Sequence, residues 1–284
     1  MALVGATWQV ASRHAVTTSL GPLELAVLRY VGPSLLLLPL AYKTGLFPSG
    51  LGKGRLALIV LGGGLPFGML AFAGAQFAPV MHMGVLLPGT MPLFVALGAW
   101  LVFGDQLGRI RMAGFAIIFA GIATVVGSSF GADTIAAGAW RGDLIFLVAA
   151  VFWAAYTLAL RDAGLTPWQS VALVNAWSAL LLLPLVLLLG VPKFHTASWH
   201  DIAVQVLAQS LLAGLAGLVL YSVAIRHLGA ARAALSGAVV PLLSAAGGWL
   251  LLRESPGVTG VVAVAAVCAG IVLAGSLGRS AQAK

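Results

Sequence analysis

Ten long apolar segments run through this chain, and they constrain its fold more than any other feature. A helix needs about 20 mostly apolar residues to cross the hydrocarbon core of a bilayer. Hydrophobic residues make up 61% of the chain and charged residues only 8%, too few to solvate a globular surface. The sequence therefore predicts an all-α polytopic membrane protein with ten transmembrane helices. The segments lie near residues 2–18, 22–42, 55–77, 80–103, 109–128, 142–160, 167–189, 203–225, 229–252 and 257–276.

The net charge of +8 does not by itself indicate binding to nucleic acid, and we expect no such partner. The fifteen Lys and Arg residues occur singly between apolar segments, whereas a nucleic-acid interface gathers them into a stripe. Basic residues of membrane proteins concentrate in cytoplasmic loops. If the N-terminus is cytoplasmic, ten basic residues fall on the inner side and four on the outer side. We therefore expect a multi-pass protein of the bacterial inner membrane with both termini in the cytoplasm.

The second half of the chain repeats the first. The stretch PLFVALGAWLVFGD at residues 92–105 matches PLLSAAGGWLLLRE at residues 241–254, and Trp8 matches Trp153 in the same order along the chain. Each copy would hold five spans, and because five is odd, the second copy enters the membrane from the opposite side. Inverted repeats of this kind are common in transporters, which bind substrate near the midplane between the two copies.

These matches divide the chain into four parts. We place the first five-helix repeat at residues 1–129, a linker at 130–140, the second, inverted repeat at 141–277 and a cytoplasmic tail at 278–284.

Three stretches carry a resemblance to a known family. They read GPLELAVLRY at residues 21–30, LVFGDQLGRIRMAGFAIIFAGIATV at 101–125 and LLLRESPGVTGVVAVAAVCAGIVL at 250–273. Together with the ten spans and the repeat, they resemble the EamA family of the drug/metabolite transporter superfamily, with the aromatic amino acid exporters as one candidate subgroup. The resemblance implies a secondary transporter with alternating access, in which helices one, three, four, six, eight and nine face the pathway.

The fourth and ninth predicted helices are weakened at the same depth. Pro88 aligns with Gly237, and Pro92 aligns with Pro241. Proline removes a backbone hydrogen bond and glycine weakens a helix interior. We interpret these four residues as hinge or gating positions, with a static kink as the alternative.

Polar and aromatic side chains deep in the spans predict a substrate pocket between the repeats. Trp and Tyr offer flat apolar faces with one polar tip, which suits a substrate with an apolar or aromatic body. Because Trp8 and Trp153 are repeat mates, we expect them to face each other across the pseudo-two-fold axis. Packing between helices or against lipid is the alternative for each residue. The predicted lining residues are Trp8, Gln9, Phe72, Gln76, His82, Met83, Trp153, Tyr156, Tyr221 and Ser236.

Arg29 is the most deeply placed charge. A charged side chain inside a span usually marks a pathway or an ion pair. We assign Arg29 a structural role as an anchor, with carboxylate binding as the alternative. The sequence shows no Asp or Glu near the middle of a span, where a proton-driven transporter usually keeps one. We therefore expect facilitated diffusion or exchange, with His82 and His14 as the only candidate proton carriers.

These features predict a secondary exporter of small amphipathic metabolites, with aromatic or apolar amino acids as the leading substrates. Multidrug or toxic-compound efflux is the alternative within transport. An intramembrane enzyme is a remote alternative, because no HExxH, GxSG or paired intramembrane aspartates occur. We expect no cofactor and no metal. The expected partners are a small-molecule substrate and the lipid bilayer, and the expected state is a monomer, with a dimer as the alternative.

Overall fold

The computed structural model describes residues 1–130 and 138–275, and the secondary structure in these two ranges is entirely helical. The prediction of an all-α protein is therefore confirmed for the described residues. Most of the predicted linker and the whole predicted tail at 278–284 lie outside them. The helices are α1 (Ala2–Thr18), α2 (Pro22–Leu36), α3 (Leu38–Thr44), α4 (Lys53–Gly63), α5 (Leu65–Phe77), α6 (Val80–Phe103), α7 (Arg109–Ser128), α8 (Ala139–Leu160), α9 (Pro167–Leu189), α10 (Lys193–Thr196), α11 (Trp199–Gln205), the π-helical η1 (Val206–Gly217), α12 (Leu218–Leu228), α13 (Ala230–Leu235), α14 (Val240–Leu252) and α15 (Gly257–Gly275).

Eight helical stretches in the described ranges are long and apolar enough to cross a membrane, so the chain is a multi-pass membrane protein. A ninth results if α2 and α3, which are bent by 71° relative to each other, form one span. Helix α1 has 17 residues, or about 25 Å at 1.5 Å per residue, which is shorter than a hydrocarbon core of about 30 Å. All ten predicted segments are helical, but the count of ten crossings stays a prediction.

Local sequence signals explain where two equivalent helices begin. Helices α2 and α9 start at the repeat mates Pro22 and Pro167, whose restricted φ suits the first helical position. Before Pro167, the Thr166 side chain accepts a hydrogen bond from the Gln169 backbone N–H, and the Gln169 side chain accepts one from the Thr166 N–H. This reciprocal capping satisfies two N–H groups that a helix start leaves unpaired.

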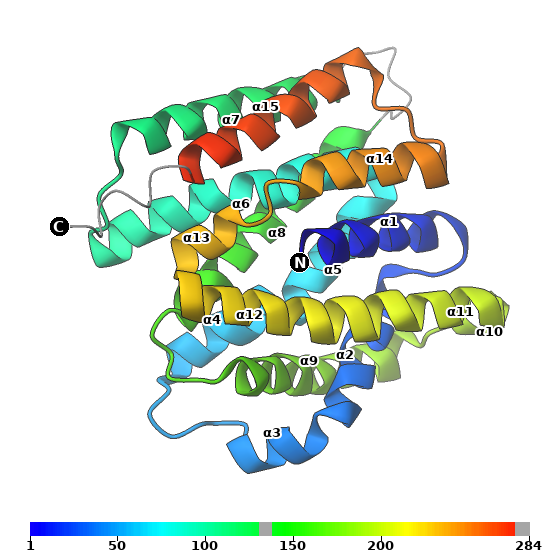
Figure 1. Ribbon diagram of the computed structural model, residues 1–284. Helices are drawn as coiled ribbons and strands as arrows, with labels where there is room; N and C mark the ends of the chain where they lie inside the picture. The colour runs from blue at the N-terminus through cyan, green and yellow to red at the C-terminus, as the bar shows by residue number, and fades with distance from the viewer. Residues whose placement is uncertain (131–137, 276–284) are drawn as a thin grey trace.

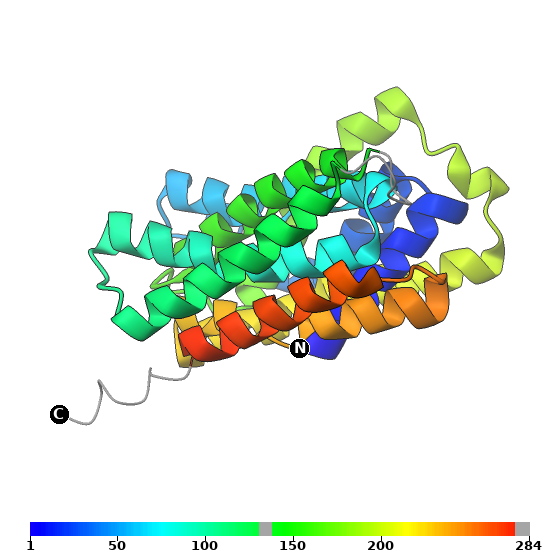
Figure 2. The same cartoon turned by 90° about the horizontal axis from the view of Figure 1, so that it is seen from above.

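Helices α7 and α15, the last helices of the two predicted repeats, pack along each other on one side of the bundle (Figures 1 and 2). Their contact is backbone to backbone. A Cβ added at Gly114 would lie 2.6 Å from the Ala274 nitrogen, and one added at Gly270 would lie 2.7 Å from the Gly114 oxygen. Small residues allow this close approach, which provides the packing that joins helices in a membrane.

The other helices contact one another in pairs that recur in both halves of the chain. Helix α1 packs on α14 and η1, while its repeat mate α8 packs on α6 and α5. Helix α6 also contacts α14, and α2 contacts α9. A two-fold relation between the predicted repeats would produce this pattern. The observed packing places α1, α5, α6, α8, η1 and α14 at the centre of the molecule.

Candidate functional site

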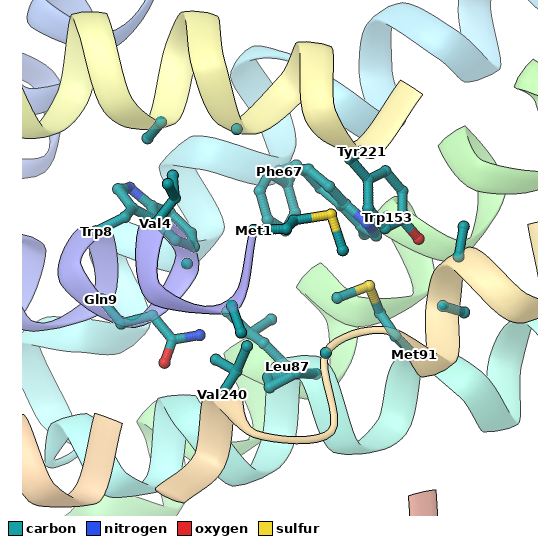
Figure 3. Close-up of a pocket in the computed structure, with 18 of the residues that line it drawn as sticks. Met1, Val4, Trp8, Gln9, Phe67, Leu87, Met91, Trp153, Tyr221 and Val240 are labelled. Carbon is teal, nitrogen blue, oxygen red and sulfur yellow. The ribbon is translucent and has the colours of Figure 1, made fainter. Parts of the chain in front are cut away.

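A cavity of about 120 Å³ lies at the centre of the bundle, next to the start of α1 (Figure 3). A single buried water needs roughly 10–15 Å³, so the cavity has room for a small organic molecule. Its wall is mostly apolar and includes Phe67 of α5, Leu87 and Met91 of α6, and Val240 of α14. The cavity therefore lies between segments from both halves of the chain.

Four of the predicted pocket residues line this cavity: Trp8, Gln9, Trp153 and Tyr221 (Figure 3). The repeat mates Trp8 and Trp153 do not stack directly on each other, because Phe67 lies between them. The Phe67 ring centroid is 6.0 Å from that of Trp8 and 4.6 Å from that of Trp153. Tyr221 continues the row, with its ring centroid 5.1 Å from that of Trp153. The four rings form a continuous aromatic wall.

A polar network holds the Trp8 ring in place. Its Nε1 atom donates to Gln209 Oε1 at 2.9 Å, and Gln209 Nε2 donates to Ser12 Oγ and Gln205 Oε1 at 3.0 Å each. The indole N–H of Trp8 is thus already used within the protein. Sequence reasoning did not select Gln209, although two Gln residues four positions apart in an apolar segment were a signal that they share one helix face.

The indole N–H of the repeat mate Trp153 is different. Trp153 is 9% exposed, and its Nε1 atom has no hydrogen-bond partner in the described ranges. The neighbouring Thr157 hydroxyl donates to the Trp153 carbonyl at 2.8 Å and lies 2.9 Å from the Tyr221 hydroxyl. An unpaired buried N–H costs about 1–3 kcal/mol. The structure therefore leaves the buried indole N–H of this cavity-lining residue unpaired.

Gln9 supplies a second donor. Its Oε1 atom accepts a 2.6 Å hydrogen bond from Ser244 Oγ, which orients the side-chain amide. With the oxygen engaged in this way, the NH₂ group faces the cavity (Figure 3).

Arg29 also lines the cavity, although its backbone belongs to α2. The side chain is 2% exposed, Nε and Nη1 have no hydrogen-bond partner, and no carboxylate lies within 4 Å among the described residues. The guanidinium carbon lies 4.8 Å from the centroid of the Trp8 ring. Such a contact stabilises a cation by about 0.5–2 kcal/mol, less than the several kcal/mol that burial of a charge costs. The structural role that the sequence suggested for Arg29 stays a prediction.

Three predicted residues are buried away from the cavity. Phe72 packs against the edge of Trp8 at 6.3 Å, and Met83 is fully buried in the core. Tyr156 is also fully buried, and its hydroxyl lies 3.2 Å from Ser222 Oγ. Phe72 and Tyr156 thus contact rings of the aromatic wall.

Gln76 and Ser236 are exposed and do not reach the cavity. Gln76 lies in the last turn of α5, and its backbone oxygen accepts a hydrogen bond from Arg13. The Ser236 hydroxyl turns back to donate to the Ala233 carbonyl at the end of α13. A role of these two residues in the pathway stays a prediction.

His82 belongs to a separate buried cluster. Its Nδ1 atom lies 2.8 Å from Asp143 Oδ1, and the Ser129 hydroxyl donates to Asp143 Oδ2 at 2.5 Å. Asp143 is completely buried at the start of α8. The sequence analysis did not select Asp143, which lies at the edge of an apolar segment.

The four proposed hinge residues behave differently in the two halves. Helix α6 continues through Pro88 and Pro92, whereas the equivalent segment is broken between α13 and α14, at residues 236–239. Pro241 has no backbone N–H to donate to the Gly237 carbonyl, and glycine itself has a low helix propensity. Both residues therefore disfavour a continuous helix at this break. Pro88 and Gly237 both line the cavity, and a Cβ on Gly237 would lie 3.5 Å from Pro88 Cβ. A hinge role for these residues stays a prediction.

Two ion pairs join the halves beyond the cavity. At the end of the bundle where α14 ends, Arg13 Nε lies 2.7 Å from Glu254 Oε1. At the opposite end, where α6 ends, Arg161 Nη1 lies 2.8 Å from Asp105 Oδ2 (Figure 1). Asp105 and Glu254 are repeat mates that close the two matching stretches of sequence. The carboxylates of the two pairs thus occupy matching positions of the repeat, at opposite ends of the bundle, although Arg13 and Arg161 do not match in sequence.

Comparison with known proteins identifies the family. The EamA-like transporter family matches residues 1–127 and 140–276, which together make up nearly the whole chain. An uncharacterized transporter of Bacillus subtilis (strain 168), YyaM, is 26% identical over 223 residues, covering 74% of this chain and 70% of YyaM. A protein crystal structure superposes with a TM-score of 0.63 at 20% identity, covering 100% of this chain and 96% of the other, so the fold is shared. The function is transport rather than enzymatic catalysis, and the chain belongs to the EamA-like transporter family, within the drug/metabolite transporter superfamily.

Proposed function

We propose that this transporter exports small amphipathic metabolites by alternating access, with aromatic or apolar amino acids as the leading substrates. The observation that carries the proposal is the aromatic wall of Trp8, Phe67, Trp153 and Tyr221 in a cavity between the two halves of the chain. Flat rings bind apolar and aromatic bodies over a large area. Ligand sites in transporters with internal repeats lie at such an interface.

The two ion pairs at opposite ends of the bundle, Arg13–Glu254 and Asp105–Arg161, support alternating access. Arg13 lies five residues beyond Trp8 along α1, or about 7.5 Å, and Arg161 lies eight residues beyond Trp153, or about 12 Å. Each pair thus lies between the level of the cavity and one end of the bundle. We infer that one pair opens while the other stays closed, as an inverted pair of five-helix repeats would allow.

Downhill transport is part of the proposal. The lining residues of the cavity, which all lie in the described ranges, include no Asp or Glu that could carry a coupled proton. We infer facilitated diffusion or exchange, in an inner membrane, with both termini in the cytoplasm. Efflux of toxic cations is disfavoured, because the side chain that brings a charge to the cavity is the cationic Arg29.

Reconstitution tests this function. Liposomes that contain the protein are loaded with radiolabelled phenylalanine or leucine, and efflux is compared with protein-free liposomes. We expect protein-dependent efflux that follows the concentration gradient and is unchanged by a pH gradient. Uphill accumulation driven by a pH gradient would contradict downhill transport, and His82→Ala is then the first variant to measure. Absence of efflux for these and other amphipathic solutes would contradict the export function itself.

A further inference from the structure

We propose that the cavity selects a monoanionic substrate, a carboxylate on an apolar or aromatic body, and that Arg29 and the indole N–H of Trp153 are the groups that bind the anion. This inference rests on the proposed transport function and, among small amphipathic metabolites, favours carboxylates over zwitterionic amino acids. It depends on two buried side chains that line one cavity, Arg29 with Nε and Nη1 unpaired and Trp153 with Nε1 unpaired.

The hydrogen-bonding groups of the cavity point to an anion. Arg29 contributes two unpaired nitrogen atoms, and Trp153 contributes one. The NH₂ group of Gln9 adds a further donor, because its oxygen is engaged by Ser244. Donors without matching acceptors are complementary to an oxygen-rich, negatively charged head group.

The protein holds Arg29 without neutralising it. The guanidinium lies over the Trp8 ring at 4.8 Å, and that ring is oriented by its hydrogen bond to Gln209. Close packing also positions the backbone of Arg29, since a Cβ added at Gly214 of η1 would lie 2.4 Å from the Arg29 carbonyl oxygen. Each of the two unpaired nitrogen atoms, Nε and Nη1, can donate a charge-assisted hydrogen bond to a carboxylate oxygen.

A substrate ammonium group finds no comparable site. No acidic residue occurs among the described residues that line the cavity. The face of Trp8, an indole of the kind that binds cations best, already carries Arg29. A zwitterionic amino acid would therefore leave its ammonium group without a counter-charge. We expect the affinity order carboxylate, then amino acid, then amine for molecules that share one aromatic body.

Four probes with the same phenyl ring test this order: 3-phenylpropionate, phenylalanine, 2-phenylethylamine and the neutral 2-phenylethanol. Binding is measured by calorimetry with the protein in lipid nanodiscs. We expect 3-phenylpropionate to bind about 10- to 100-fold more tightly than 2-phenylethylamine, because charge-assisted hydrogen bonds are formed only by the carboxylate. Equal affinities, or tighter binding of the amine, would overturn the inference.

Variants then locate the anion site. Arg29→Met should remove most of the preference for 3-phenylpropionate and leave 2-phenylethanol binding within about twofold, because a neutral molecule does not need the guanidinium. Trp153→Phe keeps a ring and removes the N–H, so it should weaken 3-phenylpropionate several-fold more than 2-phenylethanol. Arg109→Met at the exposed start of α7 is the matched control and should change neither affinity. An unchanged preference in Arg29→Met that still binds 2-phenylethanol would contradict the assignment.

Transport separates failure of this inference from failure of the proposed function. The impermeant 2-phenylethanesulfonate and benzyltrimethylammonium ions carry permanent charges, so neither crosses the bilayer unaided. Liposomes with the wild-type protein should release the sulfonate faster than the ammonium ion. Faster release of the ammonium ion would contradict anion selection while leaving export intact. Absence of release of both ions and of phenylalanine would contradict the transport proposal instead.

Discussion

Arg13 Nε lies 2.7 Å from Glu254 Oε1, and this ion pair joins the end of α1 to the residue just beyond α14. Further hydrogen bonds reinforce it. Arg13 Nη1 donates to the Ala75 carbonyl at 2.7 Å, and Glu254 Oε2 accepts from the Val80 N–H at 2.8 Å. The side chains of Arg13 and Glu254 thus bind the backbone on either side of the turn between α5 and α6. We infer that this end of the pathway is closed in the structure.

The ion pair of Arg161 and Asp105, at the other end of the bundle, is more exposed to solvent. The side chains of Arg161 and Asp105 are 34% and 39% exposed, against 16% and 20% for Arg13 and Glu254. A hollow of about 380 Å³, lined by Arg161 and Ser222, adjoins this end. Exposed ion pairs contribute little to stability because water competes with them. We therefore expect the ion pair at the Arg161 end to separate more readily than the pair at the Arg13 end.

We predict that Glu254→Gln opens the end closed by Arg13. The test uses Val16→Cys, a buried position in the last turns of α1, in a Cys268→Ala background. A membrane-impermeant maleimide should label Val16→Cys faster in the presence of Glu254→Gln, because loss of the carboxylate charge weakens the ion pair. The matched control Asp105→Asn acts at the other end and should not raise this labelling rate. Equal rates with and without Glu254→Gln would contradict a gating role.

Replacement of Trp153 by Ala should weaken substrate binding. Loss of one stacking ring costs about 0.5–1.5 kcal/mol beyond the lost contact area, so the dissociation constant should rise several-fold or more. Calorimetry with the tightest-binding probe measures the change. Trp177→Ala serves as the control, because Trp177 is on α9 and contacts Phe47 and the Leu46 carbonyl outside the cavity. If Trp177→Ala abolished binding while Trp153→Ala did not, the central site would be wrong.

Gln209→Leu should destabilise the protein and disorder the Trp8 ring. The substitution keeps the side-chain volume similar and removes the acceptor of the Trp8 N–H, along with the donor to Ser12. A buried donor left without a partner costs about 1–3 kcal/mol. Thermal unfolding in detergent, followed by tryptophan fluorescence, should show a lower midpoint than Gln106→Leu, which changes an exposed glutamine. Equal midpoints would show that the network does not stabilise the fold.

Asp143→Ala should destabilise the start of α8 more than Asp143→Asn. Alanine leaves His82 and Ser129 without their shared partner, and removal of one member of a buried pair costs about 3–5 kcal/mol. Asparagine retains one carbonyl acceptor and should cost less. Asp162→Asn, whose side chain is 82% exposed in the wild type, is the control for thermal unfolding. A midpoint for Asp143→Ala equal to that of the control would contradict a stabilising role.

Cysteine labelling tests the orientation in the membrane. With Cys268→Ala as background, an impermeant reagent applied to intact cells should reach Ala197→Cys but not Gly50→Cys. The expectation follows from the excess of basic residues on the side that holds residue 50. The reverse pattern would place both termini outside the cytoplasm.

The sequence predicted the membrane class, the helical segments and the family, because each depends on local composition or on spacing along the chain. It also selected Trp8, Gln9, Trp153 and Tyr221, since polar and aromatic groups are conspicuous in an apolar segment. It gave equal weight to Gln76 and Ser236, which are exposed. Membrane helices are apolar around their whole circumference, so hydrophobic periodicity does not indicate which face of a helix is buried.

Only the tertiary structure decided which groups are paired and which are available to a ligand. The partners of Trp8 and His82, namely Gln209 and Asp143, lie 201 and 61 residues away along the chain, and no local pattern links them. The sequence by itself determined that Arg29 is a charge inside a span. Whether Arg29 would find a counter-ion depended on how α2 packs against helices that are distant in sequence. That packing placed Arg29 in a cavity wall, with two of its nitrogen atoms unpaired.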